Sequence, residues 1–214
     1  MRVVDLHGGL ERAVDVTARV VKDGGVILYP TDTIYGIGCD ATNKPAVERI
    51  ITIKKREEDT HFIVLVHSLD VLKRLIGDVP KSVLKKVEKI IPAPVTFIFT
   101  SSQYAASSIP GCTNTIAVRV PDYEFCRRLC ELCNGPVLST SANIHGEQPG
   151  VNLATIAADV KQEVDLAIDG GELIGKPSTI VNVTGGTFRI VREGAYPRQA
   201  LIEKLGREGS ISIE

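Results

Sequence analysis

Residues 29–38 read Tyr-Pro-Thr-Asp-Thr-Ile-Tyr-Gly-Ile-Gly, and they follow directly on the short apolar run 26–29. Such a run is typical of a buried strand, so the hydroxyls, the carboxylate and the two glycines stand just past a strand end. In open α/β sheets, ligands bind at strand ends. A tight surface turn is the alternative interpretation. Neither GxxxxGK[ST] nor GxGxxG occurs here, which excludes a Walker A loop and a dinucleotide fingerprint.

Helical and strand patterns alternate on both sides of this stretch. Apolar residues at helical spacing over 10–21 end at a Gly-Gly pair, which predicts a helix before the strand 26–29. After this strand the sequence predicts a helix from Asn43 to Arg56 with Pro45 in its first turn, a strand 62–66, and helices that start at Ser68 and at Pro80. A strand 95–100, a loop 101–113, a strand 115–120, a helix after Asp122 and a strand 136–139 follow. The last predicted elements are a helix carrying Leu153, Ile156, Ala157 and Val160, and a hairpin of 178–183 and 187–191 around Gly185-Gly186.

This order of elements predicts the fold class. The predicted helices and strands alternate in similar numbers along the chain, which is typical of an α/β fold. The late hairpin adds antiparallel pairing to the sheet. We therefore predict a single α/β domain over 1–214, with a twisted mixed (parallel and antiparallel) sheet flanked by helices. Its motif-bearing core runs from about residue 10 to residue 200.

Composition restricts the possible classes of function. The formal net charge is −1, so there is no general basic excess for binding polyanions, and phosphate chemistry would need a local pocket. No long apolar run resembling a signal peptide or membrane anchor stands near the first residues. We therefore expect a cytoplasmic protein with no membrane contact.

Cysteine usage favours reduced thiols. Five cysteines is an odd number in a chain that is not small, which argues against a disulfide framework. Cys130 and Cys133 form a CxxC, but with Cys126 and Leu129 they make an apolar stripe on the predicted helix after Asp122. We predict core packing for them rather than a redox or zinc role, because no second pair of ligands stands at zinc spacing.

Two basic sites are candidates for anion binding. Lys54, Lys55 and Arg56 close the second predicted helix, where cations suit the helix dipole and ordinarily face solvent. A triphosphate held without a Walker loop would need such side chains. Arg119 lies within the apolar run 115–121, where an unpaired buried charge is costly. Its partner is either a protein carboxylate or a ligand carboxylate.

A second cluster of small polar groups follows another predicted strand. Residues 138–143 read Leu-Ser-Thr-Ser-Ala-Asn, so several hydrogen-bonding groups converge past the strand end. Taken alone, the cluster would also serve as a helix cap.

In combination, these segments resemble the YrdC/YciO family from about residue 24 to residue 194. The family's YPT[DE]TxYGLG corresponds to 29–38, and its KxR to Lys54 and Arg56. The other matching motifs are PGPxT at 92–96, AVRxP at 117–121, SAN at 141–143, GxxST at 175–179 and RxG at 192–194. Two positions differ, because Leu65 replaces the family histidine near the amino-acid substrate and Ala93 replaces a glycine. The YciO-like branch typically loses the KxR and the SAN, whereas this chain keeps both.

The resemblance implies an enzyme, an L-threonylcarbamoyladenylate synthase. It would condense L-threonine, bicarbonate and ATP to threonylcarbamoyl-AMP and pyrophosphate, for N6-threonylcarbamoyladenosine formation in tRNA. The implied cofactor is Mg²⁺ with ATP, without a protein metal cage or a tightly bound organic cofactor, and the implied partner is a downstream tRNA threonylcarbamoyl transferase. The alternatives are a YciO-like RNA-binding protein, with direct RNA contact, or another nucleotide-dependent carbamoyl or acyl transferase.

The resemblance also implies a set of site residues. The ATP side would contain Lys54, Arg56, Thr60, Thr115, Ser141, Asn143 and Arg192, of which Lys54, Arg56, Ser141 and Asn143 would be catalytic. The threonine side would contain Thr33, Arg119, Ser139 and Ser178, with Arg119 pairing with the substrate carboxylate.

Overall fold

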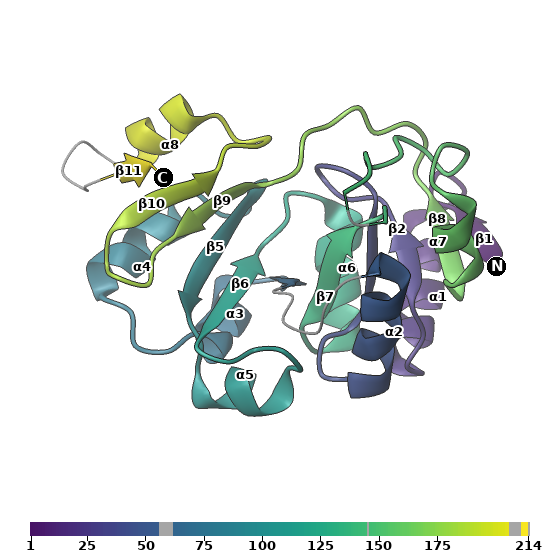
Figure 1. The fold of residues 1–214 in the computed structure, drawn as a ribbon, viewed down its shortest axis with the longest axis horizontal. Coiled ribbons are helices and arrows are strands. Elements are labelled where there is room, and N and C mark those ends of the chain that lie inside the picture. Colours follow the sequence, from purple (N-terminus) through teal and green to yellow (C-terminus); the bar gives the residue numbers. More distant parts are fainter. Residues whose placement is uncertain (56–61, 145, 206–210, 214) are drawn as a thin grey trace.

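A computed structural model describes residues 1–55, 62–144, 146–205 and 211–213, and its strands join in one sheet (Figure 1). Along the sheet the order is β1-β8-β2-β3-β7-β4-β6-β5-β9-β10-β11. The strands are β1 (Arg2–Asp5), β2 (Ile27–Tyr29), β3 (Gly36–Asp40), β4 (Ile63–Leu65), β5 (Val95–Thr100), β6 (Thr115–Arg119), β7 (Val137–Ser141), β8 (Leu166–Asp169), β9 (Thr179–Asn182), β10 (Phe188–Arg192) and β11 (Ile211–Ile213).

The sheet is mixed, as predicted. Parallel pairs join β1 to β8, β2 to β8, β4 to β6, β5 to β9 and β10 to β11. Antiparallel pairs join β2 to β3, β3 to β7, β4 to β7, β5 to β6 and β9 to β10. The late hairpin is therefore confirmed as the antiparallel pair of β9 and β10.

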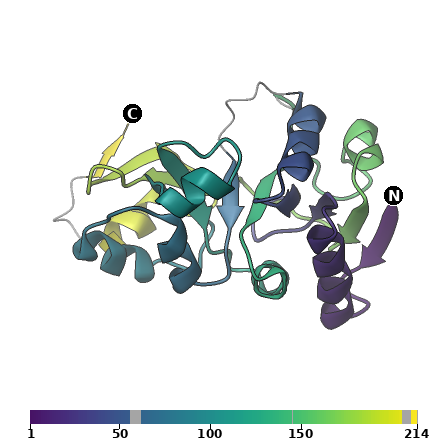
Figure 2. The ribbon, with the colours of Figure 1, turned by 90° about the horizontal axis from the view of Figure 1, so that it is seen from below.

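Helices cover the sheet on both faces. They are α1 (Leu10–Lys22), α2 (Lys44–Lys54), α3 (Leu69–Leu75), α4 (Lys81–Glu88), α5 (Gln103–Ser108), α6 (Glu124–Cys133), α7 (Ala158–Gln162) and α8 (Arg198–Leu205). Figure 2 shows α1 and α6 on one side of the sheet, opposite α2 and α7. The α/β fold with flanking helices is thus confirmed.

Local sequence explains where α2 begins and ends. The Asn43 side chain accepts a hydrogen bond from the backbone N–H of Ala46, and Pro45 occupies the first turn, where it needs no helical donor. Lys55 ends the helix with a left-handed backbone, at φ 49°. These signals place Lys54 in the last turn, with its side chain turned toward the sheet.

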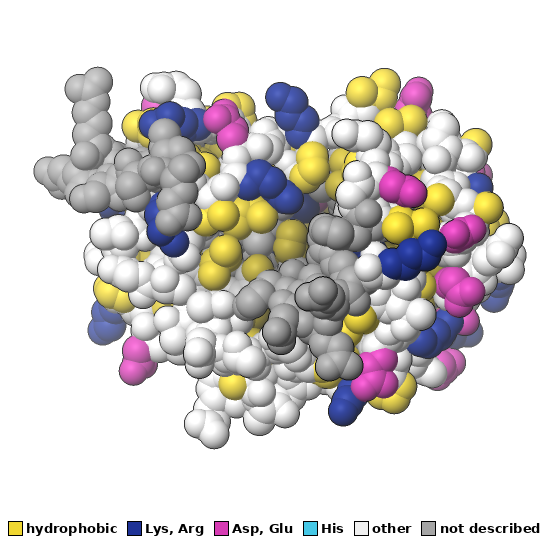
Figure 3. Space-filling view, viewed as in Figure 1, with side chains coloured by type: hydrophobic (Ala, Val, Ile, Leu, Met, Phe, Trp, Pro, Cys, Tyr) yellow, Lys and Arg dark blue, Asp and Glu magenta, His cyan; other side chains and the backbone are white. Residues whose placement is uncertain are grey.

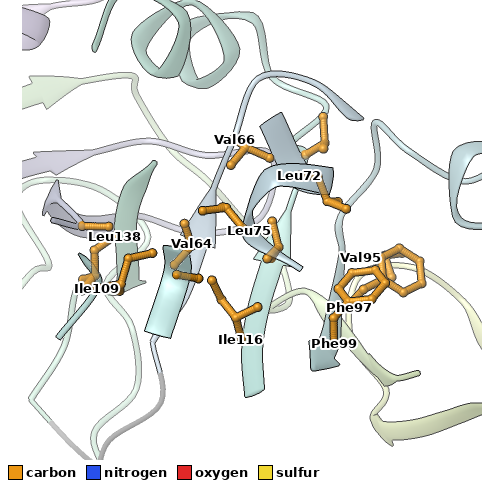
Figure 4. Close-up of a cluster of buried hydrophobic side chains, with 14 of the residues drawn as sticks. Val64, Val66, Leu72, Leu75, Val95, Phe97, Phe99, Ile109, Ile116 and Leu138 are labelled. Carbon is orange, nitrogen blue, oxygen red and sulfur yellow. The ribbon is translucent and has the colours of Figure 1, made fainter. Parts of the chain in front are cut away.

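The buried side chains form two clusters on the sheet. The larger contains residues of the central strands together with α2, α3 and α4. Figure 4 shows part of it, where side chains of α3 pack on those of β4, β5 and β6. The smaller lies between α1, α6 and strands that include β2 and β8. Cys126 and Cys130 are buried in this second cluster, and all five thiols are free, so the prediction of core packing without disulfides is confirmed.

Several elements differ from the sequence prediction. Residues 36–38 were expected in a ligand loop, but they belong to the interior strand β3, where pairing on both sides outweighs the low strand propensity of glycine. A short helix, α5, stands in the predicted loop, because Ser102 caps it by accepting from the N–H of Ala105. The predicted helix over Leu153–Val160 is wrong for its first part, since Thr155 and Asn152 form a local hydrogen-bonded turn and α7 begins only at Ala158.

Four elements were not predicted at all. These elements are the strands β1, β8 and β11 and the helix α8. Their hydrophobic patterns are too short to be distinguished from the sequence of a loop. The strands β1 and β11 lie at the two edges of the sheet, where a strand pairs on one side only. Their pairing depends on partners distant in sequence, which a local pattern does not contain.

Candidate active site

A cavity of about 350 Å³ opens where the central strands end. Its volume falls in the usual range for small-molecule pockets, roughly 300 to 1,000 Å³. Its polar wall includes seven of the residues predicted from sequence, namely Thr33, Arg119, Ser139, Ser141, Asn143, Ser178 and Arg192. Its apolar wall includes Ile34, Phe62, Ile63, Leu65 and Ile180. Figure 3 shows hydrophobic side chains near the centre of this face, with Lys and Arg side chains beside them.

Arg119 is the last residue of β6 and is only 5% exposed. Its Nη2 forms a salt bridge with Asp32, and its Nη1 donates to the Thr33 hydroxyl at 3.1 Å. The Asp32 carboxylate also accepts from the backbone N–H of Asp122 at 3.0 Å. Of the two anions considered for Arg119, the protein carboxylate is therefore present. The Nε of Arg119 is buried and has no hydrogen-bond partner among the described residues.

Ser139 lies on β7 and is held from behind by Tyr29. The Tyr29 hydroxyl lies 2.7 Å from the Ser139 Oγ, although β3 runs between their two strands. Gly38 on β3 makes this possible, because a Cβ there would lie 3.2 Å from the Tyr29 hydroxyl and 2.4 Å from the Leu138 carbonyl oxygen. Burial raises the pKa of Tyr29 well above its ordinary value, so the phenol keeps its proton.

Lys54 differs from the usual cation at a helix end, because its side chain is buried. Its Nζ donates to the Ser141 carbonyl oxygen at 2.7 Å and to the Asn143 Oδ1 at 2.7 Å. Further contacts reach the Ser141 Oγ and the Asn143 carbonyl oxygen. Ser141 and Asn143 line the cavity, whereas Lys54 is not among its wall residues, so the structure places Lys54 beneath the loop that forms this side of the site.

Ser178 and Arg192 form the opposite side. The Arg192 Nη2 donates to the Ser178 carbonyl oxygen at 2.9 Å, and the Nε donates to the same oxygen at 3.2 Å. The Ser178 Oγ lies 2.8 Å from the hydroxyl of Thr96, which is fully buried. Partial burial, together with the nearby Arg119, lowers the pKa of Arg192. Two guanidinium groups therefore face one cavity, and only Arg119 has a carboxylate partner within the described part of the chain.

The remaining predicted site residues lie elsewhere. Thr115 is outside the main cavity and lines a separate space of about 20 Å³, so the structure does not bring it together with the other ATP-side residues. Arg56 and Thr60 lie outside the described residues. Sequence reasoning did not assign roles to Asp32, Tyr29 or Thr96. All three nevertheless lie in segments singled out from sequence, Tyr29 and Asp32 in the 29–38 stretch and Thr96 at the end of the 92–96 motif.

The fold and the cavity define an α/β protein with a polar ligand site at the middle of one mixed sheet. Residues 19–194 match the Sua5–YciO–YrdC family, whose description is "Telomere recombination". The match covers most of the chain, and the protein belongs to this family.

Two relatives carry the same functional name. The chain is 30% identical over 197 residues to a threonylcarbamoyl-AMP synthase of Pyrococcus abyssi, a match covering 92% of this chain and 58% of the relative. It is 36% identical over 175 residues to a threonylcarbamoyl-AMP synthase of Pseudomonas aeruginosa, covering 80% of this chain and 94% of that protein. The chain thus spans less than two thirds of the archaeal relative.

Solved structures agree with the fold. Sua5 of P. abyssi, complexed with L-threonine, matches with a TM-score of 0.88 and 28% identity, over 100% of this chain and 62% of that one. YciO of E. coli matches with a TM-score of 0.82 and 28% identity, over 96% of this chain and 98% of that one. The family therefore includes both named synthases and YciO.

No helix within the described residues has the length and apolar character needed to cross a membrane. No three His, Cys, Asp or Glu side chains within the described ranges gather in a way that could hold a metal ion.

Proposed function

We propose that the protein is an L-threonylcarbamoyladenylate synthase. It would condense L-threonine, bicarbonate and ATP to threonylcarbamoyl-AMP, with release of pyrophosphate. The observation that supports this most is the cavity, whose wall brings the Arg119 guanidinium together with Ser141 at the end of β7 and with Asn143 in the loop that follows. The names of the two relatives, which are synthases of this product, support the same reaction.

In this proposal the threonine side is built on Arg119, Thr33, Ser139 and Ser178, which all line the cavity. The Arg119 guanidinium supplies positive charge for the amino-acid carboxylate. The apolar residues Ile34, Ile63 and Leu65 face the same space and would exclude water around the substrate methyl group.

The nucleotide side is built on Ser141, Asn143 and Arg192, with Lys54 holding the loop in place. Arg192 offers positive charge that no described carboxylate neutralises, which suits a phosphate group. Arg56, Thr60 and Thr115 stay in the proposed ATP set on the family resemblance alone. We propose that Mg²⁺ reaches the site with the triphosphate, held largely by phosphate oxygens.

The chemistry would depend on placement more than on a protein nucleophile. The threonine amine and bicarbonate give a carbamate, one of whose oxygens attacks the α-phosphorus of ATP while pyrophosphate leaves. Holding the carbamate oxygen in line with the leaving group, and neutralising charge on the phosphates, lowers the barrier for such a transfer. The product would then pass to a tRNA threonylcarbamoyl transferase.

A specific observation supports a second candidate, because YciO matches the whole fold at the same identity as the threonine-bound Sua5. A YciO-like protein or an RNA-binding protein would share the cavity without making the adenylate. The chain's net charge of −1 gives little general attraction for RNA.

One assay distinguishes these possibilities. Pyrophosphate release is measured with ATP, Mg²⁺, bicarbonate and L-threonine, with each component omitted in turn and each other amino acid substituted for threonine. Mass spectrometry identifies the adenylate. We expect release only with the full threonine mixture, loss of release in Arg119→Ala, and unchanged release in the surface variant Arg128→Ala. A salt-dependent RNA shift without pyrophosphate release would favour the RNA-binding candidate instead. Release with a different amino acid would indicate a related transferase.

A further inference from the structure

Each of two serines on the cavity wall is backed by a deeply buried hydroxyl. Ser139 is contacted by Tyr29 at 2.7 Å, and Ser178 is contacted by Thr96 at 2.8 Å. Tyr29 and Thr96 are both fully buried. Neither belongs to the cavity wall, so each contacts the site through the serine that it bonds.

A hydroxyl has one hydrogen to donate and lone pairs that accept. The number of hydrogen-bond partners around a buried hydroxyl therefore decides which of two hydroxyls is the donor. Within the described residues, the Tyr29 hydroxyl has Ser139 as its only hydrogen-bond partner. If Ser139 donated to Tyr29, the buried phenol hydrogen would have no acceptor, which is costly. Tyr29 therefore donates, and Ser139 accepts.

The same count applies to Thr96. Its hydroxyl contacts only the Ser178 Oγ among the described residues, so it donates to that oxygen. The Arg192 Nη2 also points at the Ser178 Oγ, from 3.4 Å. Ser178 thus accepts from the protein and keeps its own hydrogen.

The Thr33 hydroxyl differs from the two serines, because its hydrogen is donated within the protein. The Thr31 hydroxyl donates to the Ile34 carbonyl oxygen at 2.7 Å, so Thr33 is the donor in its 2.9 Å contact with Thr31. Arg119 Nη1 donates to the Thr33 oxygen. The Thr33 hydrogen is used within the protein, which leaves only a lone pair for the cavity.

We propose that Tyr29 and Thr96 are positioning residues that hold Ser139 and Ser178 as hydrogen-bond donors toward the cavity. The two serine hydroxyls then offer two donors beside the Arg119 guanidinium, which select a ligand with acceptor oxygens, such as a carboxylate or a carbamate. The identification of L-threonine as that ligand rests on the proposed function. The direction of the hydrogen bonds from Tyr29 and Thr96 does not depend on it.

The first test measures L-threonine binding by calorimetry in Tyr29→Phe and Thr96→Val, which keep the side-chain shape and lose the hydroxyl. We expect the Kd to rise about threefold to tenfold in each, as for one hydrogen bond. The matched control is Thr17→Val, which removes a fully buried hydroxyl bonded to Ala13 in α1, away from the cavity. Its Kd should equal that of the wild type.

A double-variant cycle separates positioning from general damage. If Tyr29 acts through Ser139, then Tyr29→Phe should change the Kd little in a Ser139→Ala background. The pair Thr96→Val and Ser178→Ala should behave the same way. An equal loss of affinity in both backgrounds would overturn the proposal, because the buried residue would then act independently of its serine.

A second measurement needs no ligand. Ser139→Ala leaves the Tyr29 hydroxyl buried without an acceptor, so its Tm should fall, and adding Tyr29→Phe should recover part of that fall. Ser178→Ala and Thr96→Val should show the same recovery. A double variant less stable than the serine variant alone would overturn the hydroxyl pairing. Failure of the wild type to bind L-threonine would contradict the proposed function, while recovered Tm values would still support the pairing.

Discussion

The side-chain nitrogen of Lys54 lies 2.7 Å from the amide oxygen of Asn143, which connects the last turn of α2 to the loop that follows β7. Lys54 is 1% exposed, and burying an ammonium group is costly unless oxygens surround it. Two backbone carbonyls and two side-chain oxygens of the loop provide this surrounding. The cation therefore stabilises the loop that carries Ser141 and Asn143.

Replacing Lys54 by Met should reduce both stability and activity. The change keeps most of the side-chain length but leaves loop oxygens unsatisfied, which costs about 1 to 3 kcal/mol in the free energy of unfolding. Urea denaturation measures this free energy, and pyrophosphate release measures the effect on turnover, which we expect to fall at least tenfold.

The control for this change is Lys44→Met on the same helix. The Lys44 side chain is 74% exposed and, within the described part of the chain, has Glu48 at 3.8 Å as its ion-pair partner, so its removal should cost about a few tenths of a kcal/mol. Equal stability of Lys54→Met and Lys44→Met would show that the buried contacts contribute nothing to the loop.

Arg119→Lys should not behave as a conservative change. The guanidinium contacts Asp32 and Thr33 through separate nitrogens, whereas a lysine presents one compact ammonium. We expect the KM for L-threonine to rise at least tenfold and the KM for ATP to change less than threefold. A comparable rise in both constants would place Arg119 on the nucleotide side or in a purely structural role.

How far sequence predicts this site differs from residue to residue. Arg119 was predictable because a charge inside an apolar run needs a buried anion, but the run does not say which anion. Its partner Asp32 lies 87 positions away and meets it only when β2, β3 and β6 are assembled in the sheet. The hydrogen bond between Tyr29 and Ser139 was equally unpredictable from sequence, because it depends on the strand order and on the space left by Gly38.

Lys54 shows why a local rule fails. A lysine in the last turn of a helix ordinarily faces solvent, and the pattern around it gives no reason to expect otherwise. Burial follows from the α2 contacts with the sheet and from the carbonyl groups of a loop far along the chain. Regular elements with strong periodicity, such as α1 and β5, were predicted because their patterns are local.

Alkaline conditions should destabilise the protein through its buried thiols. Burial raises the pKa of Cys39 to about 12 and that of Cys133 to about 11, and it raises the pKa of Cys126 and Cys130 as well. In the unfolded chain a thiol ionises near 8.5. Above that pH the unfolded state has lost protons that the folded state still binds, so stability falls as pH rises.

Thermal unfolding between pH 7.5 and 10 measures this effect. The Tm should decrease steadily above about pH 8.5, and the double variant Cys39→Ala, Cys133→Ala should show a smaller decrease. Alkylation of the native protein by iodoacetamide at pH 8 should be slow, because little thiolate is present. A Tm that stays constant over this range would contradict the assigned pKa directions.

Leu65 is the position where the chain departs from its family at the site. It is 2% exposed, lines the cavity and pairs in register with Arg119 on the neighbouring strand. In a regular strand, residues 61, 63, 65 and 67 would share one face. Ile63 and Leu65 do line the cavity, but β4 ends at Leu65, and His67 is not among the cavity residues. His61 lies outside the described residues.

Leu65→His should strengthen L-threonine binding modestly. An imidazole at this position would face the cavity beside Arg119, where it can form one hydrogen bond with the substrate, worth roughly 0.5 to 1.5 kcal/mol. Calorimetric titration with L-threonine measures the change, and Leu65→Met, which conserves volume without adding a polar group, is the matched control and should leave the Kd nearly unchanged. Weaker binding in Leu65→His would mean that this site holds threonine through Arg119 and the two serines alone, with Leu65 contributing shape rather than a missing hydrogen bond.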